Sequence, residues 1–580
     1  MSSTVPGRFD VDMVYDEVAA RKGAPVKDHK AHSEGIRRRL ILCGAGLAMA
    51  FGVLGIRTVQ LALDTPAPTY AGGYIPSDSS EPSLEDRDGR ALALNVKGFG
   101  LAINGSEVWD ADEAAEGLAS IFPQVDPDKL RIKLSARQRV TIDRVISERQ
   151  REQVLALGLP GIDFPEADIR AYPQGRLFSH VIGYQIPGRG GVTGLEGALT
   201  ARELQGPQKT TLQVAAQTVL VSELSLAMRR FEARAAWGIL MNAKDGSVVS
   251  MVSLPDFDPN VPGASEAEAR RNRTVSDTYE LGSGFKALTI AMALEDGQVA
   301  LDTPVDVTSP LKVGDWEIED YSEKGNILTV EEILAYSSNI GTAQLALLMG
   351  EDGFREALGE FGLLERMSTS LPESRSPLIP RQWGPAEIAT VSYGHGIAVS
   401  PLQLVSSFSA LVNGGEIVTP RFLESDPVEA RRVISPQTSL AMRRALRSVV
   451  TEGTGGFAEA QDYYVIGKTA TADKPGVGGY NDDGPIISSF IGAFPGYNPE
   501  YVLLISLDEP QGNADTKGYA TAGWTAAPAF SRVVERLSPI LGIRPVKDDV
   551  AADGFLTILG ERGDRNPRQA AGDVSENEAR

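Results

Sequence analysis

The sequence predicts one membrane-spanning helix followed by two domains, of which the second is of the α+β class. Its 580 residues are enough for more than one domain. Strand-like runs stand at both ends of residues 231–545, with mainly helical sequence between them. In such an arrangement the first and last segments pair into one antiparallel sheet, and the helices pack against it. A long apolar run near the N-terminus supplies the membrane helix.

The membrane segment is predicted over residues 37–63. Residues 1–36 are polar, and a run of arginines then precedes apolar sequence that reaches Leu63. No basic residue follows Leu63 until Arg87. The positive-inside rule therefore places the N-terminal tail in the cytoplasm and the rest of the chain in the periplasm. No convincing signal-peptide cleavage site is present, so we expect an inner-membrane anchor, with a buried core helix as the alternative.

Residues 84–230 form a predicted pedestal domain of mixed α/β pattern. A linker rich in proline, serine and glycine, residues 64–83, joins it to the anchor. One of its helices opens with a capping box of Ser147 and Gln150. The pedestal holds no pattern typical of chemistry, which favours a spacer or docking role. Its expected elements are helices over residues 111–122 and 147–157 and a strand over residues 140–145.

The last domain, residues 231–545, begins with a predicted hairpin. Lys244-Asp245-Gly246 separates two strand-like runs, as a tight turn between paired strands does. After the domain, residues 546–580 are charged and nearly without aromatic residues, which predicts a disordered tail. The expected strands of the domain cover residues 237–242, 247–253, 464–472, 486–494 and 501–507, and a closing helix covers residues 526–541.

The composition excludes several classes of function. A net charge of −21 argues against nucleic acid as a partner. Cys43 is the one cysteine, so neither an intrachain disulfide nor a cysteine-rich metal site can form. Of the four histidines, only His180 and His395 follow the anchor, and a Ser-His-Asp site would need one of them. The glycine-rich surroundings of His395 favour a structural role.

The centre of the predicted chemistry is an apolar helix within residues 279–297. Gly282 and Ser283 mark its start, and Lys286 follows Ser283 by about one turn on the same face. A serine hydroxyl becomes a nucleophile when a base takes its proton, and a lysine can be that base if burial lowers its pKa. A second Ser-x-x-Lys match, at Ser309, precedes no helical run, and we interpret it as a chance match.

Two later motifs supply the other groups that acyl transfer needs. In Ser337-x-Asn339, the hydroxyl of Ser337 can pass a proton to the leaving amine, and Asn339 can hold the substrate amide. A second lysine close to the base would lower the pKa of that base by like-charge repulsion.

The third motif reads Lys-Thr-Ala-Thr from Lys468 and lies on the first of the late strands. Lys468 and Thr469 offer a cation and a hydroxyl to a terminal carboxylate. Thr471 follows on the same strand as a further substrate-binding residue. The backbone N–H groups of Ser283 and Thr471 can form an oxyanion hole.

These three motifs, in this order, resemble those of the penicillin-binding proteins and serine β-lactamases. The pedestal narrows the resemblance to the class B penicillin-binding proteins, in their cell-division (FtsI-type) branch. This resemblance implies a peptidoglycan D,D-transpeptidase that crosslinks stem peptides ending in D-Ala-D-Ala at the septum. It also implies covalent reaction with β-lactams at Ser283 and no cofactor or metal. The further motifs that carry it are Asp86-Arg-Asp-Gly89, Gly194-Leu-Glu196, Leu254-Pro-Asp-Phe-Asp-Pro-Asn260, Tyr279-Glu-Leu-Gly-Ser283, Tyr393-Gly-His-Gly396 and Asp508-Glu-Pro-Gln-Gly512.

The chain departs from the family pattern at three places. Ala470 replaces the glycine of the usual Lys-Thr-Gly, and its methyl group shares the strand face of Lys468. We expect slower acylation than in an Ala470→Gly variant, unless neighbouring side chains have shrunk. Gln213 replaces an aspartate before the interdomain helix, and the Arg-Gly before Asp86 is missing. Ala470 motivates an alternative function, a catalytically weak or inert scaffold or β-lactam sensor of the division machinery.

The anchor itself predicts a membrane partner. Gly44, Ala48 and Gly52 recur every four residues and line one face, where small residues let another helix approach closely. Nothing in the pedestal looks able to polymerise glycan strands, yet a crosslinking enzyme needs them made nearby. Resemblance to class B proteins implies a polytopic glycan polymerase of the SEDS family as the partner, beside other membrane proteins of the divisome.

Overall fold

The computed structural model describes residues 75–76, 81–186, 189–202, 204, 206–321, 326–474 and 484–546. All of them belong to one compact unit that begins at Gly72. The predicted anchor, residues 37–63, and residues 547–580 of the predicted tail lie outside these ranges. Within the ranges, none of the helices combines the length and the apolar character needed to cross a bilayer.

A five-stranded antiparallel sheet forms the centre of the C-terminal domain. Its order, β11-β10-β22-β21-β20, places the first two strands of the domain beside the last three. The predicted pairing of the two ends of the domain is therefore confirmed. The strands are β10 Ala235–Asn242, β11 Val248–Leu254, β20 Ile466–Asp473, β21 Ile486–Phe494 and β22 Tyr501–Asp508.

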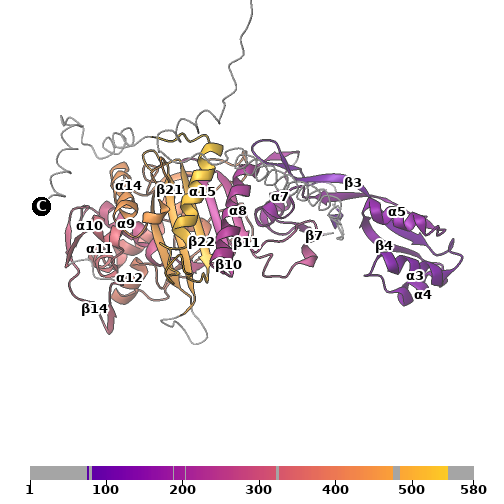
Figure 1. The fold of residues 1–580 in the computed structure, drawn as a ribbon, viewed down its shortest axis with the longest axis horizontal. Helices are drawn as coiled ribbons and strands as arrows, with labels where there is room; N and C mark the ends of the chain where they lie inside the picture. Colours follow the sequence, from indigo (N-terminus) through magenta and orange to yellow (C-terminus); the bar gives the residue numbers. More distant parts are fainter. Residues whose placement is uncertain are drawn as a thin grey trace, which may run out of the picture. The chain divides into compact units, whose positions relative to one another are not determined.

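Helices cover both faces of this sheet, which explains why its strands are almost continuously apolar. Alternate residues of β10 enter different cores: Trp237 and Ile239 pack in one, and Ala236 and Leu240 in the other. Figure 1 shows α8 (Val214–Arg230) and α15 (Ala526–Ile540) on one side of the sheet. On the other side lie α9 (Lys286–Glu295), α11 (Asn339–Glu360) and α14 (Pro436–Thr451). The closing helix predicted over residues 526–541 is α15.

The mainly helical middle of the domain lies between β11 and β20. Several of its helices begin at a serine or threonine cap, and α10 has a complete capping box between Thr329 and Glu332. The helices are α9 Lys286–Glu295, α10 Val330–Tyr336, α11 Asn339–Glu360, α12 Pro385–Ser392, α13 Pro401–Ser409 and α14 Pro436–Thr451. Short strand pairs join them: β12 Tyr279–Glu280 with β17 Ala398–Val399, β13 Pro304–Asp306 with β16 Ile327–Thr329, β14 Leu311–Val313 with β15 Trp316–Ile318, and β18 Glu416–Val418 with β19 Ala430–Arg432.

The pedestal is built on a second sheet around the long strand β3, Ala91–Asn104. The predicted strand over residues 140–145 is β4, and the predicted capping box of Ser147 and Gln150 is present. Strand β3 was missed because Gly98 and Gly100 interrupt its alternation of apolar and polar residues. The other elements are β1 Ile75–Pro76, β2 Leu84–Glu85, β4 Arg139–Ile146, β5 Ile162–Asp163, β6 Glu166–Ala171, β7 Gln185–Ile186, β8 Gly190–Gly191, β9 Gln208–Lys209, α3 Ala111–Ile121, α4 Pro127–Ser135, α5 Glu148–Ala156, α6 Ser179–Ile182 and α7 Gly194–Arg202.

Gln213 departs from the family pattern, and an aspartate of the pedestal takes over the capping of the helix that follows it. Gln213 precedes α8, but its side chain makes no capping hydrogen bond. Instead Asp86, which is fully buried, accepts a 3.0 Å hydrogen bond from the backbone N–H of Val214. The same carboxylate accepts the N–H groups of Asp88 and Arg90. An anion therefore still faces the positive end of α8, although it comes from a distant turn.

Two further motifs of the sequence, those that contain Glu196 and Asn260, form buried contacts between elements of the structure. Glu196 makes a fully buried ion pair with Arg170 at 2.8 Å, and Gln185 donates to the other oxygen of Glu196. Asn260 accepts from the backbone N–H of Tyr172 and donates to its carbonyl oxygen, at 2.9 and 3.1 Å. These polar groups are buried but paired, so they fix one arrangement of the elements around them.

Candidate active site

Ser283 lies on a single 3₁₀ turn, η3 Gly282–Gly284, that leads into α9. The sequence predicted one helix from Gly282, so the first turn is tighter than expected. The backbone on both sides explains this difference. A Cβ atom at Gly282 would lie 2.2 Å from the carbonyl oxygen of Thr471, and one at Gly394 would lie 2.3 Å from the carbonyl oxygen of Gly282. Only glycine allows such approaches, and they fix the turn that carries Ser283.

Ser337 stands between the two lysines of the predicted site. The Nζ of Lys286 donates to the Ser337 carbonyl at 2.5 Å and lies 3.1 Å from its Oγ. The Nζ of Lys468 lies 3.1 Å from the same Oγ. Ser337 ends α10 in the left-handed conformation (φ 66°, ψ 43°), which turns its side chain out of the helix. Residues far apart in the sequence are thus brought into one hydrogen-bonded group.

Burial sets the charge state of the two lysines. Their side chains are 1% and 0% exposed, for Lys286 and Lys468. Burial holds the pKa of Lys286 well below its usual range, and the charge of Lys468 lowers it further, while Asp320 raises it. Burial also lowers the pKa of Lys468 to about 7. A neutral amine at Lys286 can accept a proton, as the sequence argument required.

The hydroxyl of Ser283 makes no hydrogen bond to any residue that the structure describes. Lys286, whose side chain was expected within reach of it, contacts Ser337 instead. The Ser283 turn and α9 nevertheless keep the two residues on adjacent turns. In this structure, the side chain of Lys286 is therefore hydrogen-bonded to Ser337 and not to Ser283.

Asp320 is the residue of the site that sequence reasoning missed. It lies after β15 and accepts hydrogen bonds at the start of α11, from the hydroxyl of Ser338 at 2.6 Å and from the N–H groups of Asn339 and Ile340 at 2.5 and 3.0 Å. The Asn339 side-chain amide donates to the Glu319 carbonyl at 2.9 Å. The carboxylate therefore orients the whole Ser337-x-Asn339 motif by capping its helix.

The third motif occupies the edge strand of the sheet. Strand β20 pairs with β21 on one side and ends the strand order, so its other edge faces the serine turn. The hydroxyl of Thr469 lies 3.2 Å from the Nζ of Lys468 and 2.6 Å from the hydroxyl of Thr454. Thr471 accepts the N–H of Ala522 with its hydroxyl, while its backbone lies against Gly282. The backbone of Thr471 therefore lies against Gly282, the residue that precedes Ser283.

The two histidines after the anchor do not contact Ser283. Nδ1 of His395 lies 2.9 Å from a carboxylate oxygen of Glu280, and this contact raises the pKa of the imidazole. His180 is buried against the Ala269 carbonyl, and burial lowers the pKa of His180 to about 4. The placement of His395 agrees with the structural role predicted for it. In the part of the chain that the structure describes, no cluster of three or more His, Cys, Asp or Glu side chains could hold a metal ion.

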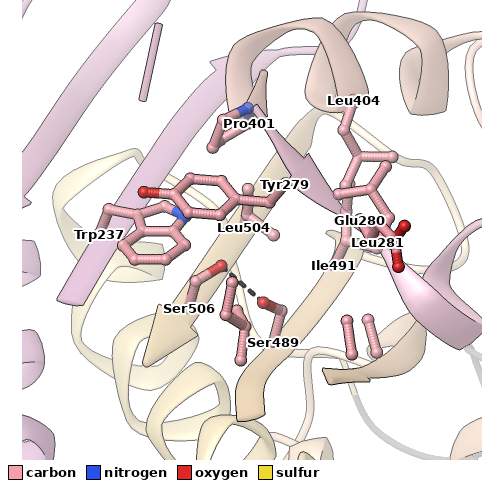
Figure 2. Close-up of a pocket in the computed structure, with 13 residues that line it drawn as sticks. Trp237, Tyr279, Glu280, Leu281, Pro401, Leu404, Ser489, Ile491, Leu504 and Ser506 are labelled. Atoms are coloured by element: carbon pink, nitrogen blue, oxygen red, sulfur yellow. Dashed lines mark hydrogen bonds between the residues drawn. The ribbon is translucent and has the colours of Figure 1, made fainter. Parts of the chain in front are cut away.

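A small cavity of about 20 Å³ lies behind the serine turn, with room for about one water molecule. Figure 2 shows Trp237 and Tyr279 stacked along it, at 4.6 Å between ring centroids, and the hydrogen bond between Ser489 and Ser506. Ala470 is also part of the lining. The cavity is therefore small and largely apolar.

Two family models match the chain. The penicillin binding protein transpeptidase domain matches residues 237–535, and the penicillin-binding protein dimerisation domain matches residues 83–205. The first match contains all the site residues described above, and the second lies in the predicted pedestal.

Individual proteins are similar over most of the chain. A probable peptidoglycan D,D-transpeptidase FtsI of Caulobacter vibrioides is 36% identical, over 82% of this chain and 83% of its own length. The peptidoglycan D,D-transpeptidase FtsI of Escherichia coli K12 is 28% identical, over 91% and 96%. The fold of a mycobacterial penicillin binding protein 3, solved with aztreonam, matches with a TM-score of 0.64 at 24% identity, over 82% of this chain and 98% of that one.

Proposed function

The chain belongs to the class B penicillin-binding proteins, and we propose that it is a peptidoglycan D,D-transpeptidase that works through an acyl-enzyme on Ser283. The observation that carries the proposal is the hydroxyl of Ser337, which two buried lysines share beside the serine turn. A neutral amine, a hydroxyl and a nearby cation form a proton path from a nucleophile to a leaving amine.

In the first half of the proposed reaction, Ser283 Oγ attacks the carbonyl carbon of the penultimate D-Ala of a donor stem peptide. The hydroxyl proton passes to the neutral amine of Lys286, and the backbone N–H groups of Ser283 and Thr471 stabilise the oxyanion. The C–N bond then breaks, and the proton passes through Ser337 to the nitrogen of the departing D-Ala. An ester between Ser283 and the donor peptide remains.

In the second half, the amine of an acceptor stem peptide attacks the ester. A new amide bond forms, the C–O bond breaks, and Ser283 regains a proton from the attacking amine through the same groups. Lys468 and Thr469 bind the terminal carboxylate of the donor, and Asn339 holds its amide. With a β-lactam, the leaving nitrogen stays attached to the acyl group, so the ester persists.

A crosslinking assay distinguishes this enzyme from the alternative function, an inert scaffold or β-lactam sensor. The test is a crosslinking reaction with the full chain in detergent and glycan strands whose stem peptides end in D-Ala-D-Ala. We expect peptide dimers that penicillin prevents from forming, together with release of D-Ala. A protein that reacts with penicillin but yields neither dimers nor D-Ala would be a sensor or scaffold instead.

Asp320 should prove to be a positioning residue for the reaction. We expect Asp320→Asn to lower the rate of acylation by penicillin about tenfold, because hydrogen bonds to a charged group at the start of α11 are lost. The anion also raises the pKa of Lys286. Removal of the Asp320 charge should therefore lower the pKa of Lys286. The fall of the acylation rate at acid pH, which marks protonation of Lys286, should then occur at lower pH.

The matched control for this prediction is Asp315→Asn, an exposed carboxylate between β14 and β15. We expect it to keep the parental rate and pH profile. A loss of rate in Asp320→Asn without any movement of the acid limb would mean that the carboxylate serves folding alone.

We further propose, from the sequence of residues 37–63, that the chain is anchored in the inner membrane with its pedestal and catalytic domain in the periplasm, at the division septum. The proposed partner is a SEDS-family glycan polymerase that packs against the face formed by Gly44, Ala48 and Gly52. Relatives named FtsI support the division role.

Substituting that face should weaken the partnership. We expect Gly44→Leu with Gly52→Leu to lower co-purification of the polymerase in detergent, because large side chains prevent close helix packing. Labelling of Ser283 by penicillin should be unchanged. Gly46→Leu with Ala50→Leu, on the opposite side of the helix, is the control and should keep the partner bound. If Gly44→Leu with Gly52→Leu still co-purifies fully with the polymerase, the face of small residues is not the docking surface, and the pedestal must carry the contact.

A further inference from the structure

Gly284, the residue after the proposed nucleophile, faces Ala470 across the site. A Cβ atom at Gly284 would lie 2.9 Å from the Cβ of Ala470, well inside the separation of about 3.5–4.0 Å at which carbon atoms pack. Among the described residues outside its own chain neighbours, Ala470 is the one that such an atom would meet within 4 Å. Both positions are buried. There is space for one methyl group here and not for two.

We infer that Gly284 and Ala470 are a size-matched pair that positions Ser283. The inference rests on the proposed role of Ser283 as nucleophile. The methyl group that Ala470 brings to the floor strand occupies the space that Gly284 leaves open in the serine turn. The alanine is therefore accommodated, and the turn keeps its place over β20.

The surroundings explain why a change in this pair would move the nucleophile. The serine turn cannot simply shift aside, because Gly282 already lies against the carbonyl oxygen of Thr471 and Gly394 lies against Gly282. A second methyl group at position 284 would press against the methyl group of Ala470. Because the turn is held at Gly282, the strain would fall on the backbone of the adjacent residue, Ser283, and would disturb the placement of its hydroxyl.

The same geometry changes the expectation for Ala470→Gly. The substitution would relieve no crowding, because Gly284 has already provided the space. It would instead enlarge the cavity that Ala470 lines behind the turn, shown in Figure 2. Loss of packing beneath Ser283 should slow acylation rather than accelerate it.

A double-mutant cycle tests the pair with the full chain in detergent. The variants are Gly284→Ala, Ala470→Gly and the two combined, and the probe is fluorescent penicillin over a range of concentrations. We expect Gly284→Ala to lower the acylation rate at saturating penicillin about tenfold or more, because small misplacements of reacting groups are costly. The half-saturating concentration should change little. Ala470→Gly should lower the rate a few-fold, and the combined variant should return to within a few-fold of the parent.

Ala472→Gly is the matched control, since Ala472 lies two residues along the same strand and lines the same cavity, but a Cβ at 284 would not meet it. Combined with Gly284→Ala, it should give no recovery.

The pair is refuted if Gly284→Ala reacts at the parental rate, or if the combined variant is no better than Gly284→Ala. Equal recovery with Ala472→Gly also refutes it. Should Gly284→Ala fail to fold, a combined variant that folds and reacts supports the pair, and one that also fails overturns it. A parent protein that penicillin labels at Ser283 keeps the proposed function standing even when the cycle shows no recovery. A parent that is not labelled ends both.

Discussion

Ser283→Ala should abolish covalent labelling by fluorescent penicillin. The acyl-enzyme is an ester of the Ser283 hydroxyl, so no adduct can form without it, and removal of a serine nucleophile costs a factor on the order of 10⁶ in rate in a comparable system. The variant should keep the thermal stability of the parent, because the hydroxyl makes no hydrogen bond within the described part of the chain.

The second Ser-x-x-Lys match provides the control for this result. Ser309 is exposed, and Ser309→Ala should label like the parent. Labelling of Ser283→Ala at the parental level would remove Ser283 from the mechanism and direct attention to Ser337, whose hydroxyl lies beside the two lysines.

Lys286→Ala should lower the rate of acylation by a factor on the order of 10² to 10⁴, the usual contribution of a general base. The pH profile gives the sharper evidence. Lys286 works when its amine is neutral, and burial together with the Lys468 charge lowers its pKa. As the pH falls through that lowered pKa, the amine gains a proton and parental acylation should fall. The variant should lack this acid limb.

Two further variants separate the base from a general effect of charge. Lys468→Met removes the repulsion of Lys286, so it should raise the pKa of Lys286 and shift the acid limb to higher pH. Lys312→Ala, at the exposed chance match, should change neither rate nor profile. Unchanged acylation in Lys286→Ala would show that another group takes the proton of Ser283.

Much of the catalytic domain could be predicted from the sequence because its sheet is buried on both faces. Strands such as β21 and β22 are apolar runs of the right length between turn residues, and their bounds differ little from those expected. The order of the three motifs predicted that Lys286, Ser337 and Lys468 would lie in one site, and the structure brings these three residues together. The structure adds that Ser337 lies between the lysines, which spacing alone does not reveal.

Other features of the structure could not be predicted from patterns of neighbouring residues in the sequence. Asp320 caps a helix that begins after an intervening strand and helix, so no capping pattern joins them in the sequence. The compensation of Gln213 by Asp86 likewise links the pedestal to α8 across a long stretch of chain. The contact between Gly284 and Ala470 depends on how closely a turn approaches a strand. Such approaches are set by tertiary packing, which residue patterns do not encode.

The position of the covalent adduct tests the central claim most directly. The full chain is treated with penicillin, digested, and the modified peptide is sequenced by mass spectrometry. We predict one adduct, of the mass of intact penicillin, on the peptide that contains Ser283, and on the Ser283 side chain within it. An adduct on Ser337 or on any other residue would contradict the assignment of Ser283 as the nucleophile.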